Sequence, residues 1–168
     1  MYETPFKTEL DAQVADSIVS TARASIGDTL RSIIYFTPSA MDLLYVRRDL
    51  YESRQRAVEA KSRLVEFERV GFAEAPVRTA LSPPADPDSI GSYEFTVRVH
   101  DDGFVVRILA ADDGVILTTD DMDADAFDDA AVAISKLLAG GVARVTGAAW
   151  PQTSTERRVT ASRAVARD

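Results

Sequence analysis

His100 is the residue of this chain most suited to act as a general base, and it is the only histidine. Asp101 and Asp102 follow it directly. A general base needs a partner, such as a nucleophile or a carboxylate, held in the same cleft. An enzyme built on this chain would therefore need His100, Arg98 or Tyr45 to converge with a carboxylate. A lone histidine at a strand end beside a turn is more often a solvated side chain, and we expect no catalytic role for it.

A group of aspartates could in principle hold a hard cation. Its members are Asp120, Asp121, Asp123, Asp125, Asp128 and Asp129. Calcium is bound by several carboxylate oxygens, but the sixth position of an EF-hand loop starting at Asp121 is Ala126 instead of glycine, and the twelfth is Val132 instead of glutamate. We expect these carboxylates to stabilise the start of a helix through its dipole, by about 0.3–1 kcal/mol each, and expect no metal site.

The end of the chain is basic, although the whole chain has a net charge of −8. Residues 141–168 hold five arginines against Glu156 and Asp168, a net of +3, which leaves −11 for residues 1–140. Guanidinium groups can neutralise nucleic-acid phosphates, but this segment has one aromatic residue, Trp150, and the acidic body would repel such a ligand. We expect a disordered tail that folds back on the globule or docks a protein partner, and no nucleic-acid partner.

Other sequence signatures of chemistry are missing. The chain has no nucleophile elbow, no phosphate-binding glycine-rich loop and no HExxH sequence, and its lack of cysteine removes disulfides and thiolate chemistry. We therefore predict no catalytic residue and no cofactor.

The elements that would position any site are clearest between residues 93 and 138. Tyr93 to Val99 alternates apolar and polar residues, as a half-buried strand does, and Phe104–Leu109 and Val115–Thr118 follow as further strands. Two Asp-Asp-Gly sequences, 101–103 and 112–114, predict tight hairpin turns. We expect Tyr93, Phe95 and Phe104 mostly to fill the core. An amphipathic helix over 124–138, started by Asp121 or Asp123, then completes the globule, and Gly140 and Gly141 end it.

The first half of the chain predicts a helix, a hairpin and a second helix. Apolar residues recur every four positions over 8–25, and Gly27 stops that helix. Strands over 30–36 and 43–47, with a loop at 37–42, form the hairpin; a helix from Pro38 to Arg48 is the alternative. A helix follows over 49–70 and ends at Gly71. The four prolines between Ala75 and Gly91 predict an extended connection.

Composition limits the setting of the protein. The 168 residues allow one globular domain, which we place at 1–140, with the tail at 141–168. No apolar run approaches the roughly 20 residues of a membrane span, and the first residues lack a signal peptide, so we expect a cytoplasmic protein without a membrane partner. Abundant aspartate with only three lysines favours a salt-adapted cytoplasm, where the Debye length shrinks to about 3 Å at 1 M salt. A GC-rich bacterial genome is the alternative.

The element order, helix-strand-strand-helix-strand-strand-strand-helix, is similar to that of roadblock/LC7 domains within the profilin-like group, to which PAS and GAF sensors are related. Several segments between Ile26 and Leu138 also resemble an uncharacterised family of short haloarchaeal proteins: 35–37, 44–47, 68–72, 93–98 and 114–120. This resemblance implies an α+β fold with a five-stranded antiparallel sheet. The long interval from Phe72 to Gly91 departs from the compact roadblock pattern.

A roadblock-like resemblance implies a homodimer that acts as a platform or regulator. We therefore expect a non-enzymatic protein-interaction or regulatory module, working as a homodimeric scaffold with an unidentified protein partner. The alternative is a PAS- or GAF-like sensor of a small ligand, which requires a closed apolar pocket beside the sheet. An enzyme with unfamiliar chemistry is the third hypothesis.

Overall fold

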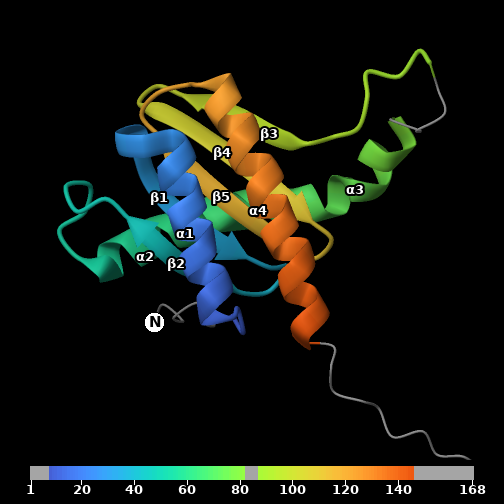
Figure 1. The fold of residues 1–168 in the computed structure, drawn as a ribbon. Helices are drawn as coiled ribbons and strands as arrows, with labels where there is room; N and C mark the ends of the chain where they lie inside the picture. The colour runs from blue at the N-terminus through green and yellow to red at the C-terminus, as the bar shows by residue number, and fades with distance from the viewer. Residues whose placement is uncertain (1–7, 82–86, 146–168) are drawn as a thin grey trace, which may run out of the picture.

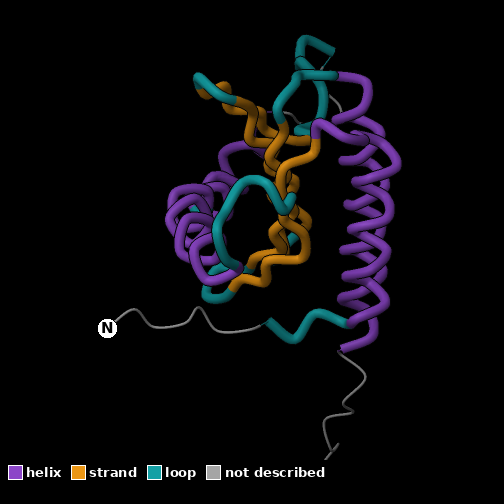
Figure 2. The backbone as a smooth tube through the Cα atoms, turned by 90° about the vertical axis from the view of Figure 1, so that its left-hand side faces the viewer, coloured by secondary structure: helices purple, strands orange, loops and turns teal. Residues whose placement is uncertain are grey.

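The computed structural model describes residues 8–81 and 87–145, and only the backbone of 141–145. One antiparallel sheet lies between two layers of helices (Figure 1). Helices α1 (Ala12–Ile26) and α4 (Ala124–Val145) cover one face, and α2 (Arg54–Glu68) and α3 (Val70–Leu81) lie on the other, as the side view in Figure 2 shows. The predicted α+β fold with a five-stranded antiparallel sheet is confirmed.

The sheet has the strand order β2-β1-β5-β4-β3, so the early hairpin and the later three strands form one layer. Strands β1 (Leu30–Phe36) and β2 (Met41–Val46) pair antiparallel, which confirms the hairpin and excludes the alternative helix from Pro38. The later strands are β3 (Phe95–His100), β4 (Gly103–Ala110) and β5 (Asp113–Thr119). Because β5 pairs with both β1 and β4, it joins the two parts at the centre of the sheet.

The two Asp-Asp-Gly sequences behave differently. The first forms the predicted turn, with His100 paired to Gly103. At the second, the turn lies one residue earlier than predicted: Ala110 pairs with Asp113, and Ala111 takes the positive φ of 54°. Gly114 lies inside β5 instead, where a Cβ atom would come within 2.4 Å of the Phe36 ring. This glycine is therefore needed for close packing, not for a turn.

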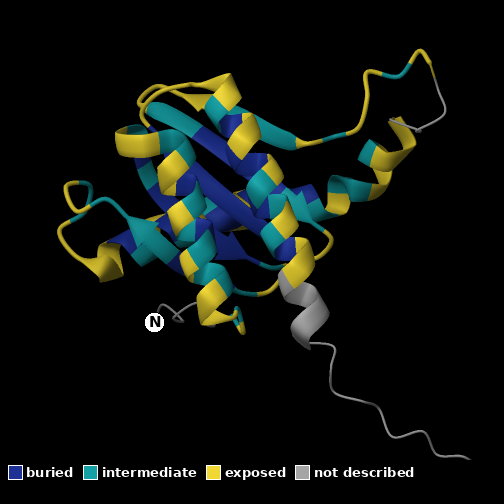
Figure 3. Ribbon diagram, viewed as in Figure 1, coloured by how far each residue is buried: buried dark blue, intermediate teal, exposed yellow. Residues whose placement is uncertain are grey.

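Alternation along the strands divides the apolar residues between two cores. Residues such as Ile33, Val106 and Leu117 face α1 and α4, whereas Ile34, Val105 and Ile116 face α2 and α3. Figure 3 shows the buried residues concentrated in the sheet and on the inner sides of the helices. Phe95 and Phe104 pack half-buried against the first core, as predicted, but Tyr93 precedes β3 and belongs to neither core.

The ends of the first helix follow simple rules of capping. Asp11 accepts hydrogen bonds from the backbone N–H groups of Gln13 and Val14, so α1 begins four residues later than predicted. Gly27 ends the helix with a φ of 70°, which confirms the predicted stop. A single 3-10 turn, Gly27–Thr29, then leads into β1.

The predicted end of the second helix at Gly71 was wrong. Arg69 separates α2 from α3, and Gly71 and Pro76 both lie inside α3. Consequently residues 75–81 of the predicted extended connection are helical, and residues 82–86 lie outside the described residues. Pro76 has no N–H to donate to the Phe72 carbonyl, whereas Arg78 donates to the carbonyl of Gly71 at 2.8 Å. A side chain thus satisfies backbone in the turn that the proline weakens.

The last helix is longer than predicted. Asp123 caps it by accepting from Ala126 N–H at 3.0 Å, as expected, but α4 continues through Gly140 and Gly141 to Val145. The first five residues of the predicted tail are therefore helical, and its remainder, 146–168, lies outside the described residues. Among the helices that the structure describes, none has the length and apolar character needed to cross a membrane.

Candidate interaction site

Strand β3 forms one edge of the sheet, and β4 is its only neighbour among the described strands. The pairing of β3 with β4 runs from Phe95–Ile108 to His100–Gly103 without a shift in register. Six residues of strand span about 20 Å. Because alternate N–H and C=O groups of an edge strand point away from its neighbour, β3 presents a regular row of backbone groups for further pairing.

The opposite edge, β2, is irregular. Ile33 pairs with Tyr45 and Ile34 with Leu43, so Leu44 is an extra residue that forms a bulge. In addition, Arg54 donates from Nη2 to the Leu43 carbonyl at 2.8 Å. A bulge and a side chain on an edge carbonyl are both devices that hinder strand addition. The sheet therefore has one regular edge and one obstructed edge.

Exposed apolar side chains accompany the regular edge. Val99 on β3 is 72% exposed and Phe67 near the end of α2 is 59% exposed. The Arg98 guanidinium lies 4.8 Å from the centre of the Phe67 ring, which places Phe67 beside β3. Val70, where α3 begins, is also exposed. Side chains alternate along β3, so Val99 flanks this edge on the α1–α4 side, whereas Phe67 and Val70 flank it on the α2–α3 side. We call β3 together with Phe67, Val70 and Val99, on both sides of the edge, the β3 face; in water such apolar surface favours association.

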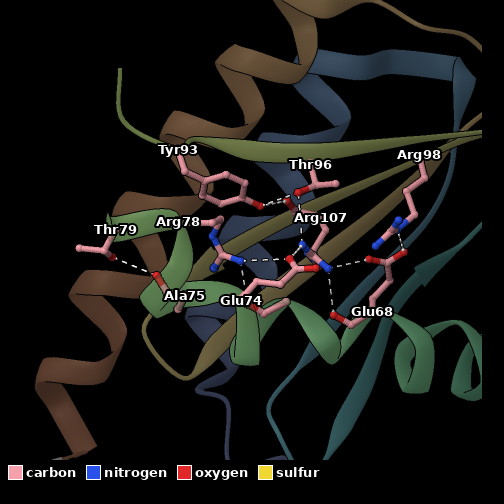
Figure 4. A network of polar contacts seen from close by, with 10 residues as sticks. Glu68, Glu74, Ala75, Arg78, Thr79, Tyr93, Thr96, Arg98 and Arg107 are labelled. Carbon is pink, nitrogen blue, oxygen red and sulfur yellow. Dashed lines mark hydrogen bonds and ion pairs between the residues drawn. The ribbon is translucent and has the colours of Figure 1, made fainter. Parts of the chain in front are cut away.

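A buried ion network lies beneath this face and holds α2 and α3 against the sheet (Figure 4). Arg107 of β4 and Glu68 of α2 are both nearly inaccessible to solvent, and Arg107 Nη1 donates to Glu68 Oε2 at 3.1 Å. Arg98 of β3 donates to the other carboxylate oxygen at 2.8 Å. Removing one member of such a group leaves an uncompensated buried charge, so the network fixes how β3 and α2 lie relative to each other.

Arg107 also anchors α3. Its Nη2 donates to Glu74 Oε2 at 2.7 Å, and this carboxylate holds the pKa of Arg107 above its usual value although burial acts in the opposite direction. Gly71 makes the approach feasible, because a Cβ atom there would lie 2.6 Å from the guanidinium carbon of Arg107. Arg107 Nε is buried without a hydrogen-bond partner among the described residues.

Charged and polar side chains, together with Phe72, whose ring centre lies 5.2 Å from that of Phe36, attach α3 to the rest of the protein. The only buried residue of α3 is Gly71. Arg78 donates to Glu74 at 3.2 Å, and its guanidinium lies 4.3 Å from the centre of the Tyr93 ring. Tyr93 in turn shares a hydrogen bond of 2.9 Å with Thr96. The ring of Tyr93 thus links α3 to the start of β3, a role that its alternation with Phe95 did not predict.

Lys61 of α2 is buried elsewhere on the same sheet face. Its Nζ lies 3.4 Å from Thr118 Oγ1, which shares a hydrogen bond of 2.6 Å with Ser32. Burial, and secondarily the charge of Arg31, lower the pKa of Lys61 from 10.5 to about 8. None of the carboxylates in the described part of the chain forms an ion pair with it. An isolated buried amine of this kind is costly to keep charged.

The three residues that an enzyme built on this chain would need lie in different places. His100 is exposed at the end of β3, and Arg98 on the same strand is engaged with Glu68. Tyr45 lies on β2, at the other end of the five-stranded sheet. Of the three, Arg98 therefore meets a carboxylate, that of Glu68, but the structure does not bring His100 and Tyr45 to it.

The aspartates at the start of α4 each bind different partners and do not converge on one point. Asp120 pairs with Arg31 and Arg47, and the hydrogen bond from Arg47 lowers the pKa of Asp120. Asp121 accepts from the N–H of Met122, and Asp123 caps the helix. Within the residues that the structure describes, histidine and acidic side chains form no group suited to a metal ion.

The ion network has a sequence signal that the pattern analysis missed. Arg107 is the single charged residue in the apolar run 104–109 of a strand that proves to be internal. Likewise Lys61 and Glu68 lie at helical spacing from Ala57 and Val65, on the stripe that faces the sheet. The network could therefore have been identified from charged residues that interrupt an otherwise apolar strand or helix stripe.

Residues 16–139 match the model of the family described as "Domain of unknown function (DUF7522)". The chain belongs to this family. The matched segment extends from α1 into α4 and so contains the β3 face and the ion network beneath it. No curated protein and no solved structure matches the chain significantly.

Proposed function

We propose that this member of the DUF7522 family is a non-enzymatic protein-interaction module that works as a homodimer, joined through the β3 face. The single observation that carries the proposal is the regular, unpaired edge of β3 beside the exposed side chains of Phe67 and Val99. An antiparallel strand that pairs with a second copy of itself forms a two-fold symmetric contact, the commonest symmetry of homodimers. The bulged β2 edge offers no equivalent surface.

Charge is compatible with self-association at this face. Arg98 is the central charged residue of β3, and the carboxylate of Glu68 on α2 compensates its positive charge. Two copies meeting along β3 would therefore bring together backbone and apolar groups without an uncompensated pair of guanidinium charges. The exposed His100 at the strand end would lie towards the rim of such a contact.

The roadblock/LC7-like layout supports a scaffold role, since the order of elements agrees with it apart from the additional helix α3. We further propose a salt-adapted cytoplasm as the setting, on the basis of the net charge of −8 and the abundance of aspartate. The chain would present its dimer to a protein partner that these observations leave unidentified.

The alternative of a ligand sensor gains no support from the described surface. A PAS- or GAF-like sensor needs an enclosed apolar pocket. Two grooves lined by described residues are open to solvent, and charged side chains make up most of the lining of each.

A change of Val99 to glutamate tests the dimer. Sedimentation velocity of the full chain over a dilution series should show a monomer–dimer equilibrium, and Val99→Glu should raise the dissociation constant about tenfold or more, because two carboxylates would be buried opposite backbone and apolar groups. Val132→Glu is the matched control, since Val132 is an exposed valine on α4, away from β3. A monomer at every concentration, or equal effects of the two substitutions, would contradict the proposal.

A further inference from the structure

An open groove of about 670 Å³ runs along the obstructed edge of the sheet, at the end opposite the β3 face. It lies between α1, which contributes Arg23, and the first residue of α2, Arg54. Between them are the end of β2 and the loop after it, which together supply Leu44, Tyr45, Val46, Arg47, Arg48 and Asp49. A volume of this size is within the range of small-molecule sites, about 300–1,000 Å³.

The charge of the groove is opposite to that of the protein. Four arginines and one aspartate line it, a net of +3 in a chain whose net charge is −8. Arg47 is neutralised, because it pairs with Asp49 at 2.8 Å and also with Asp120. Its hydrogen bonds lower the pKa of both carboxylates, so these two acids remain ionised and committed to Arg47.

The other three arginines have no carboxylate partner among the described residues. Arg23 lies with its guanidinium 5.6 Å from the centre of the Tyr45 ring, and Arg54 donates one hydrogen bond to the Leu43 carbonyl. Arg48 makes no ion pair or hydrogen bond with another described residue. Most of the N–H donors of these three side chains are therefore free for a ligand.

The positive end of a helix dipole adds to the same potential. Helix α2 is 15 residues long and begins at Arg54, a groove residue. Its cap, Ser53, accepts from the backbone N–H of Arg56, so the earlier N–H groups are not used by that cap. Such helix ends favour anions, and here the helix end coincides with three uncompensated guanidinium groups.

We propose that this groove binds a small organic polyphosphate, with the phosphate groups held by Arg23, Arg48 and Arg54. Guanidinium forks match the geometry of phosphate oxygens, and the charge of about −3 on a diphosphate ester near neutral pH balances the net +3 of the groove. A diphosphate alone would fill only part of about 670 Å³, and the exposed portions of Leu44, Tyr45 and Val46 provide a surface for the organic part.

Titration calorimetry of the full chain at low salt tests this site with ADP, inorganic pyrophosphate, citrate and a hexaglutamate peptide as probes. ADP should bind more tightly than pyrophosphate, and citrate and the peptide should bind at least about tenfold more weakly than ADP. Amide NMR shifts on ADP addition should be largest near residues 23, 44–49 and 54. Tightest binding of citrate would overturn the phosphate assignment, and tightest binding of the peptide would point to an acidic protein partner instead.

Two matched charge reversals separate the groove from general charge effects. Arg48→Glu should weaken ADP binding about tenfold or more, whereas Arg63→Glu should leave it within about twofold. Both residues are exposed, and both substitutions change the net charge equally, but Arg63 lies on α2 in a different groove. Equal losses in the two variants, or no detectable ADP binding by the unmodified protein, would overturn the proposal. Neither variant alters the β3 face, so the outcome is independent of dimerisation.

Discussion

Three buried charged residues, Lys61, Glu68 and Arg107, set much of the energetics of the α2–α3 side. Glu68 and Arg107 compensate each other, and Arg98 and Glu74 add further hydrogen bonds to them, although Arg107 Nε has no partner among the described residues. Lys61 donates to the Thr118 hydroxyl and lies over the Tyr51 ring, with no carboxylate partner among the described residues. At the scale of single residues, the ion network therefore fixes how α2 and α3 lie against the sheet. Lys61, in contrast, destabilises the folded protein by an amount that depends on pH.

Replacement of Lys61 by methionine should stabilise the protein below pH 8. A pKa of about 8 in the folded state, against 10.5 for an ordinary lysine, corresponds to a destabilisation of at most about 3 kcal/mol. Below pH 8 Lys61 is protonated in both the folded and the unfolded protein, so the full destabilisation is present. Between about pH 8 and 10.5 Lys61 is deprotonated in the folded protein but still protonated in the unfolded protein, so the destabilisation declines as pH rises. Ser32 and Thr118 keep their mutual hydrogen bond in the variant.

Urea unfolding of the unmodified protein and Lys61→Met at pH 7 and pH 10 measures this effect. The stability gap between the two proteins should be largest at pH 7 and should shrink at pH 10. The titration of other groups is common to both proteins and cancels in the comparison. A gap of the same size at both pH values would show that the lysine is not held in an unfavourable charged state.

At the scale of elements, α3 is the feature that sequence patterns predicted least well. Gly71 was predicted to end the second helix, and Pro76 was predicted to belong to an extended connection. The helix persists because Gly71 leaves room for Arg107, to which Glu74 is bound, and because the Arg78 guanidinium lies over the Tyr93 ring. The contacts of Gly71 and Glu74 with Arg107 join residues more than 30 positions apart, and local propensity holds no information about them.

Alanine at Gly71 should destabilise the protein, contrary to the usual effect of this change in a helix. Glycine to alanine at an open helical position gains about 0.5–1 kcal/mol, but here the new Cβ would overlap the Arg107 guanidinium, whose bonds to Glu68 and Glu74 prevent it from moving aside. We expect a loss of about 1–3 kcal/mol in denaturant unfolding. Gly140→Ala in α4, where a Cβ would meet nothing within 4 Å, should instead be neutral or stabilising. A change of the same sign in the free energy of unfolding of both variants would contradict this account.

The elements that were predicted well are strands and turns whose local sequence pattern follows from their place in the sheet. Alternation predicted the strand around Val97, and the Asp-Asp-Gly sequences marked off the strands around Val106 and Leu117 and predicted the hairpin turn at Asp101 and Asp102. The candidate sites were not predictable in the same way. An edge strand is recognised only when strand order is known, and the arginine groove joins residues from α1, β2 and α2 that are far apart in sequence.

At the scale of the whole molecule, the two proposed sites lie at opposite ends of one sheet and differ in their dependence on salt. Two copies of a chain with net charge −8 repel each other, so salt should favour the dimer. A polyphosphate is attracted by the net +3 of the groove, so salt should oppose its binding.

Dimerisation should therefore tighten as NaCl rises from about 0.1 to 1 M, where the Debye length falls from about 10 to 3 Å. Sedimentation equilibrium at several salt concentrations measures the dissociation constant. Val99→Glu, which adds two charges at the contact, should respond to salt more steeply than the unmodified protein. A dimer that weakens with salt would indicate that ion pairs, and not apolar and backbone contacts, hold it together.

The bulge at Leu44 and the guanidinium on the Leu43 carbonyl have a further consequence for self-assembly. A layer that accepts new strands at both margins can polymerise, and such proteins grow into filaments or amyloid-like fibres. This sheet can be extended at one margin only. Growth would end as soon as two molecules had met, because the outer margins of the pair would both be β2 strands.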